Sequence, residues 1–162
     1  AMDFALRNPG AVPGMALVAP GGIRPPKPGF LFRVIPLTFL GKPGQNRLFR
    51  IIHGPVPVFP EMLEFARTVA GGYRPMTEVP PVFSDEQLAS VDFPLLFIGG
   101  AKDVMLDMPG SAARIARFVS GAEIVLRPGY SHVLPDEGRT IAGFLRGKGD
   151  GMPALLSGRL FG

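Results

Sequence analysis

Short apolar runs and amphipathic runs alternate in two regions of the chain. Residues 13–20, 95–98 and 122–126 are continuously apolar and bounded by turn residues, as expected for strands buried on both faces. Between the last two runs, apolar residues from Ala112 to Val119 recur at helical spacing. The order strand, helix, strand predicts an α/β fold with parallel strands joined by crossover helices.

Further helices are predicted on either side of these strands. Residues 1–8 have the composition of a helix end, which Pro9-Gly10 stops. A helix with no cap before it leads us to expect that an N-terminal portion is missing. A last helix is predicted from about Pro135, with its buried face at Ile141, Ala142, Phe144 and Leu145.

Prolines recur throughout residues 23–81 and limit the length of regular elements there. Two helices are predicted, over residues 30–40, kinked or split at Pro36, and over residues 61–70. We interpret this segment as a cap inserted above the carboxyl edge of the sheet. Large apolar residues in it are candidates for lining an apolar pocket, or for packing the cap onto the body: Phe30, Phe32, Ile35, Phe39, Phe49 and Phe59.

The predicted organisation is therefore a core made of residues 1–22 and 82–147, a cap made of residues 23–81, and a loosely held tail, residues 148–162. The tail has no strong hydrophobic period and several glycines.

Composition narrows the function classes. The chain has 162 residues, a hydrophobic fraction of 46% and a formal net charge of +4, which is a globular composition. It has no cysteine and two histidines, so disulfides, thiolate catalysis and cysteine zinc sites are excluded and a multi-histidine metal site is not expected. Scattered basic residues predict no nucleic-acid partner. No signal peptide or membrane span is predicted, and the compartment stays open with the cytoplasm favoured.

The candidate chemistry lies after two of the predicted strands. Asp103 follows the strand at 95–98 and a Gly99-Gly100 turn, and His132 follows the strand at 122–126 and a turn at Gly129. The carboxyl ends of neighbouring parallel strands lie at one edge of a sheet, so these two side chains can meet there. A carboxylate bound to an imidazole would fix its tautomer and stabilise its cationic form. Asp107 is the fallback acid.

Other polar residues are better explained by local structure. Ser84 with Gln87 forms a capping-box pattern, and Ser111 is the expected N-cap of the helix that follows it. Ser131 stands beside His132 but is interpreted as a turn hydroxyl, because adjacent side chains point apart. His53 is expected to sit in the cap, packed or solvated.

The joint pattern resembles the C-terminal half of the α/β-hydrolase fold. Pro94-Leu95-Leu96-Phe97-Ile98-Gly99-Gly100-Ala101-Lys102-Asp103 looks like the family's strand and acid turn. Gly129-Tyr130-Ser131-His132, followed by Asp136-Glu137 and Phe144-Leu145, looks like its histidine loop and final helix. Residues 5–9 and 15–18 look like the helix after the nucleophile and the next strand, and the resemblance covers about residues 1–147.

One part of the family pattern is absent from this sequence. The nucleophile elbow, G-x-S-x-G, occurs nowhere in it, and by the family's spacing it would fall shortly before Ala1. The resemblance places both oxyanion-hole donors upstream as well. It therefore implies the C-terminal portion of a serine hydrolase that supplies Asp103 and His132, is inactive alone and needs no cofactor.

The resemblance also implies candidate partners. A small apolar ester-like substrate would bind under the cap, and an N-terminal hydrolase segment or a second copy would cover the exposed sheet edge. Two alternatives remain open at this point. The chain could be a non-catalytic binding or interaction module with the same half-fold, or a fragment of an aspartate-nucleophile hydrolase of epoxides or haloalkanes.

Overall fold

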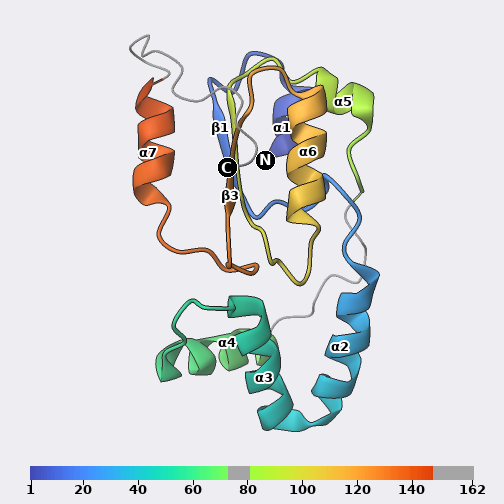
Figure 1. The fold of residues 1–162 in the computed structure, drawn as a ribbon, viewed down its shortest axis with the longest axis vertical. Helices are drawn as coiled ribbons and strands as arrows, with labels where there is room; N and C mark the ends of the chain where they lie inside the picture. The colour runs from blue at the N-terminus through green and yellow to red at the C-terminus, as the bar shows by residue number, and fades with distance from the viewer. Residues whose placement is uncertain (73–80, 148–162) are drawn as a thin grey trace.

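A computed structural model describes residues 1–72 and 81–147, and it contains a parallel three-stranded sheet (Figure 1). The strands are β1 (Met15–Val18), β2 (Leu95–Gly100) and β3 (Glu123–Arg127), in the order β1-β2-β3. Leu17 of β1 and Ile124 of β3 both lie opposite Phe97 of the central strand. The predicted parallel arrangement and its three strands are confirmed.

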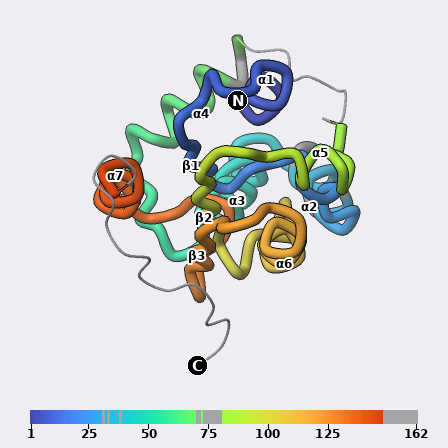
Figure 2. The backbone as a smooth tube through the Cα atoms, turned by 90° about the horizontal axis from the view of Figure 1, so that it is seen from above, coloured from blue at the N-terminus to red at the C-terminus, as the bar shows by residue number. Residues whose placement is uncertain are grey.

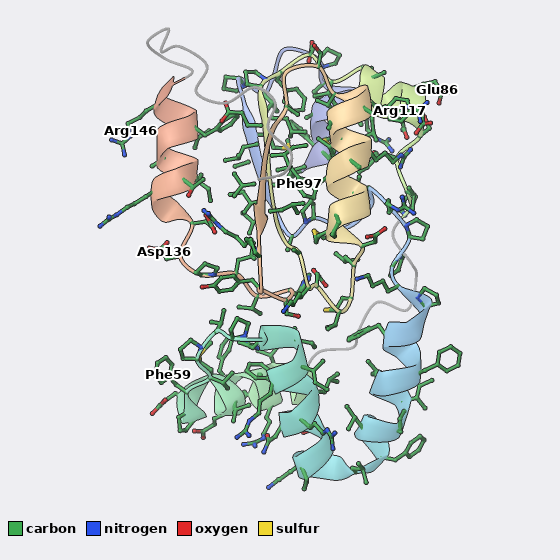
Figure 3. The ribbon with its side chains drawn as sticks, viewed as in Figure 1. Phe59, Glu86, Phe97, Arg117, Asp136 and Arg146 are labelled. Atoms are coloured by element: carbon green, nitrogen blue, oxygen red, sulfur yellow. The ribbon has the colours of Figure 1, made fainter. Side chains whose placement is uncertain are left out.

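Side chains alternate across the central strand and build a core on each face of the sheet. Leu95 and Phe97 pack against α1 (Met2–Arg7) and α6 (Met108–Phe118), whereas Leu96 and Ile98 pack with Phe144 of α7 (Gly138–Gly147). Figure 2 shows α7 on one side of the strands and α6 on the other. Both faces are covered, so every residue of β2 is buried. In Figure 3, Phe97 points from the sheet toward α6.

The helices between residues 28 and 72 form a separate layer beyond the carboxyl ends of the strands (Figure 1). The layer contains α2 (Pro28–Phe39), α3 (Gly41–His53) and α4 (Pro60–Gly72). Helix α2 continues through Pro36 without a break, so the split that was one of the two predicted alternatives does not occur. Helix α4 matches the prediction for residues 61–70 and extends it to Gly72.

Helix α3 was missed from the sequence because its first turn contains Gly41, Pro43 and Gly44. A proline is tolerated in a first turn, where the backbone amide has no intrahelical acceptor. Gly44 is buried against α2, and a Cβ added to it would collide with the carbonyl oxygen of Leu37. These residues therefore allow α3 to begin close to α2 rather than breaking it.

Two other expectations concern helix starts. The capping box is confirmed: the Gln87 amide donates to Ser84 Oγ, and the Ser84 amide donates to the Gln87 side chain, at the start of α5 (Asp85–Ala89). Ser111 as an N-cap was wrong. The N-cap of α6 is Asp107, whose carboxylate accepts from the Gly110 amide, while Ser111 is buried in the first turn. The tail predicted at residues 148–162 lies outside the described residues.

The two ends of the helical layer meet at one point of the core. The Phe83 amide donates to the Gly22 carbonyl oxygen over 2.9 Å. Arg114 of α6 then bridges both ends, because its guanidinium donates to the carbonyl oxygens of Ile23 and Phe83 and to the Asp85 carboxylate. One charged side chain therefore holds the entry and the exit of the helical layer against α6.

Replacing Arg114 should loosen this junction. Arg114→Ala removes hydrogen bonds from a charged donor to two carbonyl oxygens, which should lower the free energy of unfolding by about 2–4 kcal/mol. Arg117→Ala is the matched control, because Arg117 projects to solvent from the same helix (Figure 3) and should cost under about 1 kcal/mol. Urea unfolding measures both, and equal losses would contradict the bridging role.

Candidate active site

Asp103 is held by the turn that follows β2. Its side chain is fully buried, and its Oδ1 atom accepts from the amides of Met105 at 2.7 Å and Leu106 at 2.9 Å. A buried carboxylate needs donors for its oxygens, and an aspartate at a strand end can accept from amides two and three residues ahead. The local turn thus fixes one oxygen and leaves Oδ2 directed away from the turn.

The second oxygen of Asp103 meets the imidazole of His132. Oδ2 lies 2.8 Å from His132 Nδ1, so the structure brings together the two residues that the sequence singled out. An ionised carboxylate can only accept, and therefore Nδ1 carries the proton; in the neutral imidazole Nε2 then keeps its lone pair. The His132 side chain is 28% exposed, whereas that of Asp103 is 0% exposed.

The hydrogen bonds also set the ionisation of Asp103. Burial raises the pKa of this carboxyl, but the bonds from His132, Leu106 and Met105 outweigh it, so the pKa lies below the usual value. The folded chain therefore favours the carboxylate form of Asp103. This is the form that can orient the imidazole through Nδ1.

The histidine loop (residues 128–136) approaches β2 at Gly100. A Cβ built on Gly100 would lie 2.6 Å from the Tyr130 carbonyl oxygen and closer still to that of Ser131. The turn after β2 is bonded to the same loop, because the Lys102 amide donates to the Tyr130 carbonyl oxygen over 2.9 Å. Only a residue without a side chain lets the loop come near enough for His132 to reach Asp103.

The remaining candidates have structural partners. Asp107 caps α6 and pairs with Arg24 at 3.1 Å, so the fallback acid does not contact His132. Ser131 donates its hydroxyl to the Ile51 carbonyl oxygen. His53 is buried in α3, where it stacks on Phe49 with ring centroids 3.9 Å apart, which fits the packed alternative.

Sequence reasoning missed two interactions around the pair. Lys27 Nζ donates to the Asp103 carbonyl oxygen over 2.8 Å, from a position 76 residues away in the sequence. Arg127 binds both oxygens of the buried Glu137 at 2.7 Å and so closes the base of the histidine loop. The hydrogen bond from Arg127 holds the pKa of Glu137 below its usual value, although burial opposes it. The Asp136-Glu137 motif was the only signal of the second interaction.

One hollow lies in the helical layer, and another lies beside the acid turn. An apolar groove of about 640 Å³ is lined by Phe49 of α3 and by residues of α4: Glu61, Met62, Phe65, Ala66 and Val69. A depression of about 270 Å³ lies beside the acid turn, between Lys27, Phe30 and Val104. Of the apolar residues proposed to line a pocket, Phe49 and Phe30 do so, whereas Phe32, Ile35, Phe39 and Phe59 are more than half exposed.

Ion binding and membrane crossing each require a recognisable structural feature. Within residues 1–72 and 81–147, no three His, Asp or Glu side chains gather in a way that would hold a metal ion. In the same ranges, none of the helices combines the length and the apolar character that crossing a bilayer requires.

Filling the space at Gly100 should separate the histidine loop from β2. Gly100→Ala places a methyl group against backbone carbonyls that cannot rotate away, and we expect a loss of at least about 2 kcal/mol in the free energy of unfolding. Gly14→Ala is the control, since the nearest atom to its added Cβ is 3.6 Å away. Thermal and urea unfolding measure the difference, and similar losses in both variants would argue against the close approach.

The lowered pKa of Asp103 predicts an acid-sensitive fold. Its ionised form contributes stability that is complete above the unfolded-state pKa of about 3.9 and is lost as pH falls through the lower folded-state pKa. Asp103→Asn should therefore flatten the decline in unfolding free energy below about pH 4. Urea unfolding at several pH values tests this, with the exposed Asp92→Asn as control. A decline of undiminished slope in Asp103→Asn would refute the prediction.

Solved structures of other proteins share this fold. Carboxylesterase CesB (YbfK) from Bacillus subtilis superposes with a TM-score of 0.71 over 94% of this chain and 56% of its own, at 21% identity. Naproxen esterase (carboxylesterase NP) from Bacillus subtilis gives 0.71 over 90% and 54%, at 22% identity. The meta-cleavage product hydrolase CumD from Pseudomonas fluorescens IP01 gives 0.64 over 90% and 60%, at 18% identity.

The similarity to known proteins is one of structure over part of their length. No protein-family model and no curated protein matches the chain by sequence. The chain spans little more than half the length of the solved structures that it matches. Identities this low show the fold. The three parallel strands, the helices between them and these superpositions establish that the chain has part of the α/β-hydrolase fold.

Proposed function

We propose that this chain supplies the acid and the general base of a serine-type α/β hydrolase. The observation that carries the proposal is the 2.8 Å contact between Asp103 Oδ2 and His132 Nδ1 at the carboxyl edge of the sheet. With its proton on Nδ1, the imidazole offers Nε2 as the base, and its partial exposure favours access by a reacting group.

The chemistry follows from this tautomer. A serine hydroxyl on a G-x-S-x-G elbow would give its proton to His132 Nε2 while its oxygen attacks the carbonyl carbon of an ester. The Asp103 carboxylate would stabilise the imidazolium formed in that step. Nε2 would return the proton to the departing alcohol oxygen, and a water molecule would then release the acyl group by the same route. The elbow belongs to the resemblance, since this sequence does not contain one.

The position and lining of the helical layer are the reasons to propose an apolar substrate. It lies beyond the strand ends that carry Asp103 and His132, as a cap would (Figure 1). Its apolar groove is lined by Phe49, Met62, Phe65, Ala66 and Val69 and would accept a hydrocarbon group. The solved structures of a carboxylesterase and a naproxen esterase, which share the fold, make an ester the first substrate class to test.

The decisive experiment restores a nucleophile. The 162-residue chain alone should not hydrolyse p-nitrophenyl esters above the buffer rate. Co-expression with an α/β-hydrolase N-terminal segment that carries the elbow should give turnover, and a longer acyl chain should lower KM if it fills the groove. His132→Ala and Asp103→Asn should each reduce kcat by about 10³–10⁴-fold in the complex.

The control separates the two candidate acids. Asp107→Asn removes the ion pair with Arg24, keeps a side-chain oxygen that can cap α6 and leaves the imidazole untouched, so kcat should stay within about tenfold of the unmodified complex. Loss of turnover in Asp107→Asn together with full activity in Asp103→Asn would reverse the assignment. Ester hydrolysis by the isolated chain that requires Asp103 would contradict the need for a second segment.

A second candidate function is a non-catalytic interaction module. In the part of the chain that the structure describes, β1 pairs only with β2, so its outer edge has no strand partner, and Val18 is 46% exposed. Such an edge can accept a strand from another chain. A stable homodimer by mass measurement would favour this module, whereas a heterodimer with an elbow-bearing segment favours the hydrolase. An aspartate at the elbow would indicate the epoxide or haloalkane branch.

A further inference from the structure

Both sequence neighbours of His132 are bound to the last turn of α3. Ser131 Oγ donates to the Ile51 carbonyl oxygen over 3.2 Å, and the Val133 amide donates to the Ile52 carbonyl oxygen over 3.3 Å. These contacts join residues that lie about 80 positions apart in the sequence. The histidine loop is therefore attached to the helical layer on each side of the imidazole.

The contacts complete the hydrogen bonding of the helix end. The last four carbonyls of a helix have no intrahelical partner and must find donors elsewhere. In α3, the Arg50 carbonyl accepts from the Gly54 amide and the His53 carbonyl from the Val56 amide, both from the chain just beyond the helix. The Ile51 and Ile52 carbonyls between them accept from the histidine loop. The loop thus acts as half of the C-terminal cap of α3.

The joint between the helix and the loop is tightly packed. Gly54 turns the chain with φ of 61°, and a Cβ added there would lie 2.9 Å from Ser131 Cβ. Ser131 is 4% exposed and His53 is 6% exposed. His53 is fixed in its turn, with Nδ1 at 3.0 Å from the Phe49 carbonyl oxygen and its ring stacked on Phe49. A displacement of the α3 end would therefore move Ser131 as well.

Asp103 does not share this dependence on α3. Its Oδ1 atom is held by amides of its own turn, and Lys27, which comes before α2, binds its carbonyl oxygen. The acid is thus positioned by the sheet and the start of the helical layer. His132 has a different anchor, the end of α3. The distance between the two side chains depends on both anchors.

We propose that the carboxyl end of α3 is a positioning element for His132, and that Ser131 is its positioning residue. The Ser131 hydroxyl and the Val133 amide hold the loop where Nδ1 meets Asp103. The catalytic meaning of this inference rests on the proposed function. The bond between Asp103 and His132 can be observed without turnover, so the two ideas can fail separately.

The test follows the imidazole protons by NMR in the full 162-residue chain, where the two histidines report separately. In Ser131→Ala, exchange of the His132 Nδ1 proton with water should become about five- to tenfold faster, as expected when one net hydrogen bond is lost. The signals of His53 and of the β2 amides should change little. Ser120→Ala, at an exposed turn before β3, is the matched control and should leave the exchange rate unchanged.

A second variant reaches the same joint from the α3 side. Gly54→Ala should push Ser131 away and accelerate the same exchange, although residue 131 is still a serine. Gly10→Ala is its control, because Gly10 also has a positive φ, 78°, but no atom within 4 Å of the added Cβ. If Ser131→Ala did not fold, Ser131→Cys would fill the same space with a weaker donor and serve the same test.

The outcomes are distinct. Faster exchange in Ser131→Ala and Gly54→Ala, with both controls unchanged, supports the positioning role. Unchanged exchange in both variants, while Asp103→Asn abolishes the protected signal, overturns it and leaves the acid–base pair intact. A His132 signal that does not respond to Asp103→Asn would instead remove the basis of the proposed function.

Discussion

A fully buried carboxylate imposes the strongest constraint on this structure. Removing Asp103 from water is costly unless hydrogen bonds replace those that it loses. The acid turn provides two backbone amides for one oxygen, and the imidazole of His132 provides a donor for the other. The constraint acts on the whole sheet edge, because the histidine loop must cross close to Gly100 to bring that donor into place.

The helical layer adds a second requirement: the last backbone carbonyls of α3 need hydrogen-bond donors. Helix α3 ends against the histidine loop with two carbonyls that its own segment does not satisfy. Their donors come from Ser131 and Val133, so the helix end and the loop stabilise one another. The acid is held from the sheet and the base partly from the layer above it. The geometry of the pair thus combines local turn chemistry with a contact between segments distant in the sequence.

Local sequence patterns were sufficient to predict those elements that are determined by neighbouring residues. Continuous apolar runs predicted all three strands to within a few residues, and strand-end turns predicted that Asp103 and His132 would meet. Helix α3 could not be predicted in this way. The glycines and the proline of its first turn read as breakers, and only the contact with α2 shows why Gly44 is needed. The contacts of Lys27 and Ser131 carry no local signal, because their partners lie 76 and 80 residues away.

The meeting of Gly22 and Phe83 has a consequence for how such a chain can change. Since the helical layer leaves and re-enters the core at adjacent points, its length contributes only a slowly growing loop-closure entropy and does not change the strand register. Insertions or exchanges in that layer can therefore change which substrate is bound without altering the sheet. Such changes must keep the turn at Gly54, where the helical layer packs against Ser131 of the histidine loop, and Lys27, which binds the acid turn.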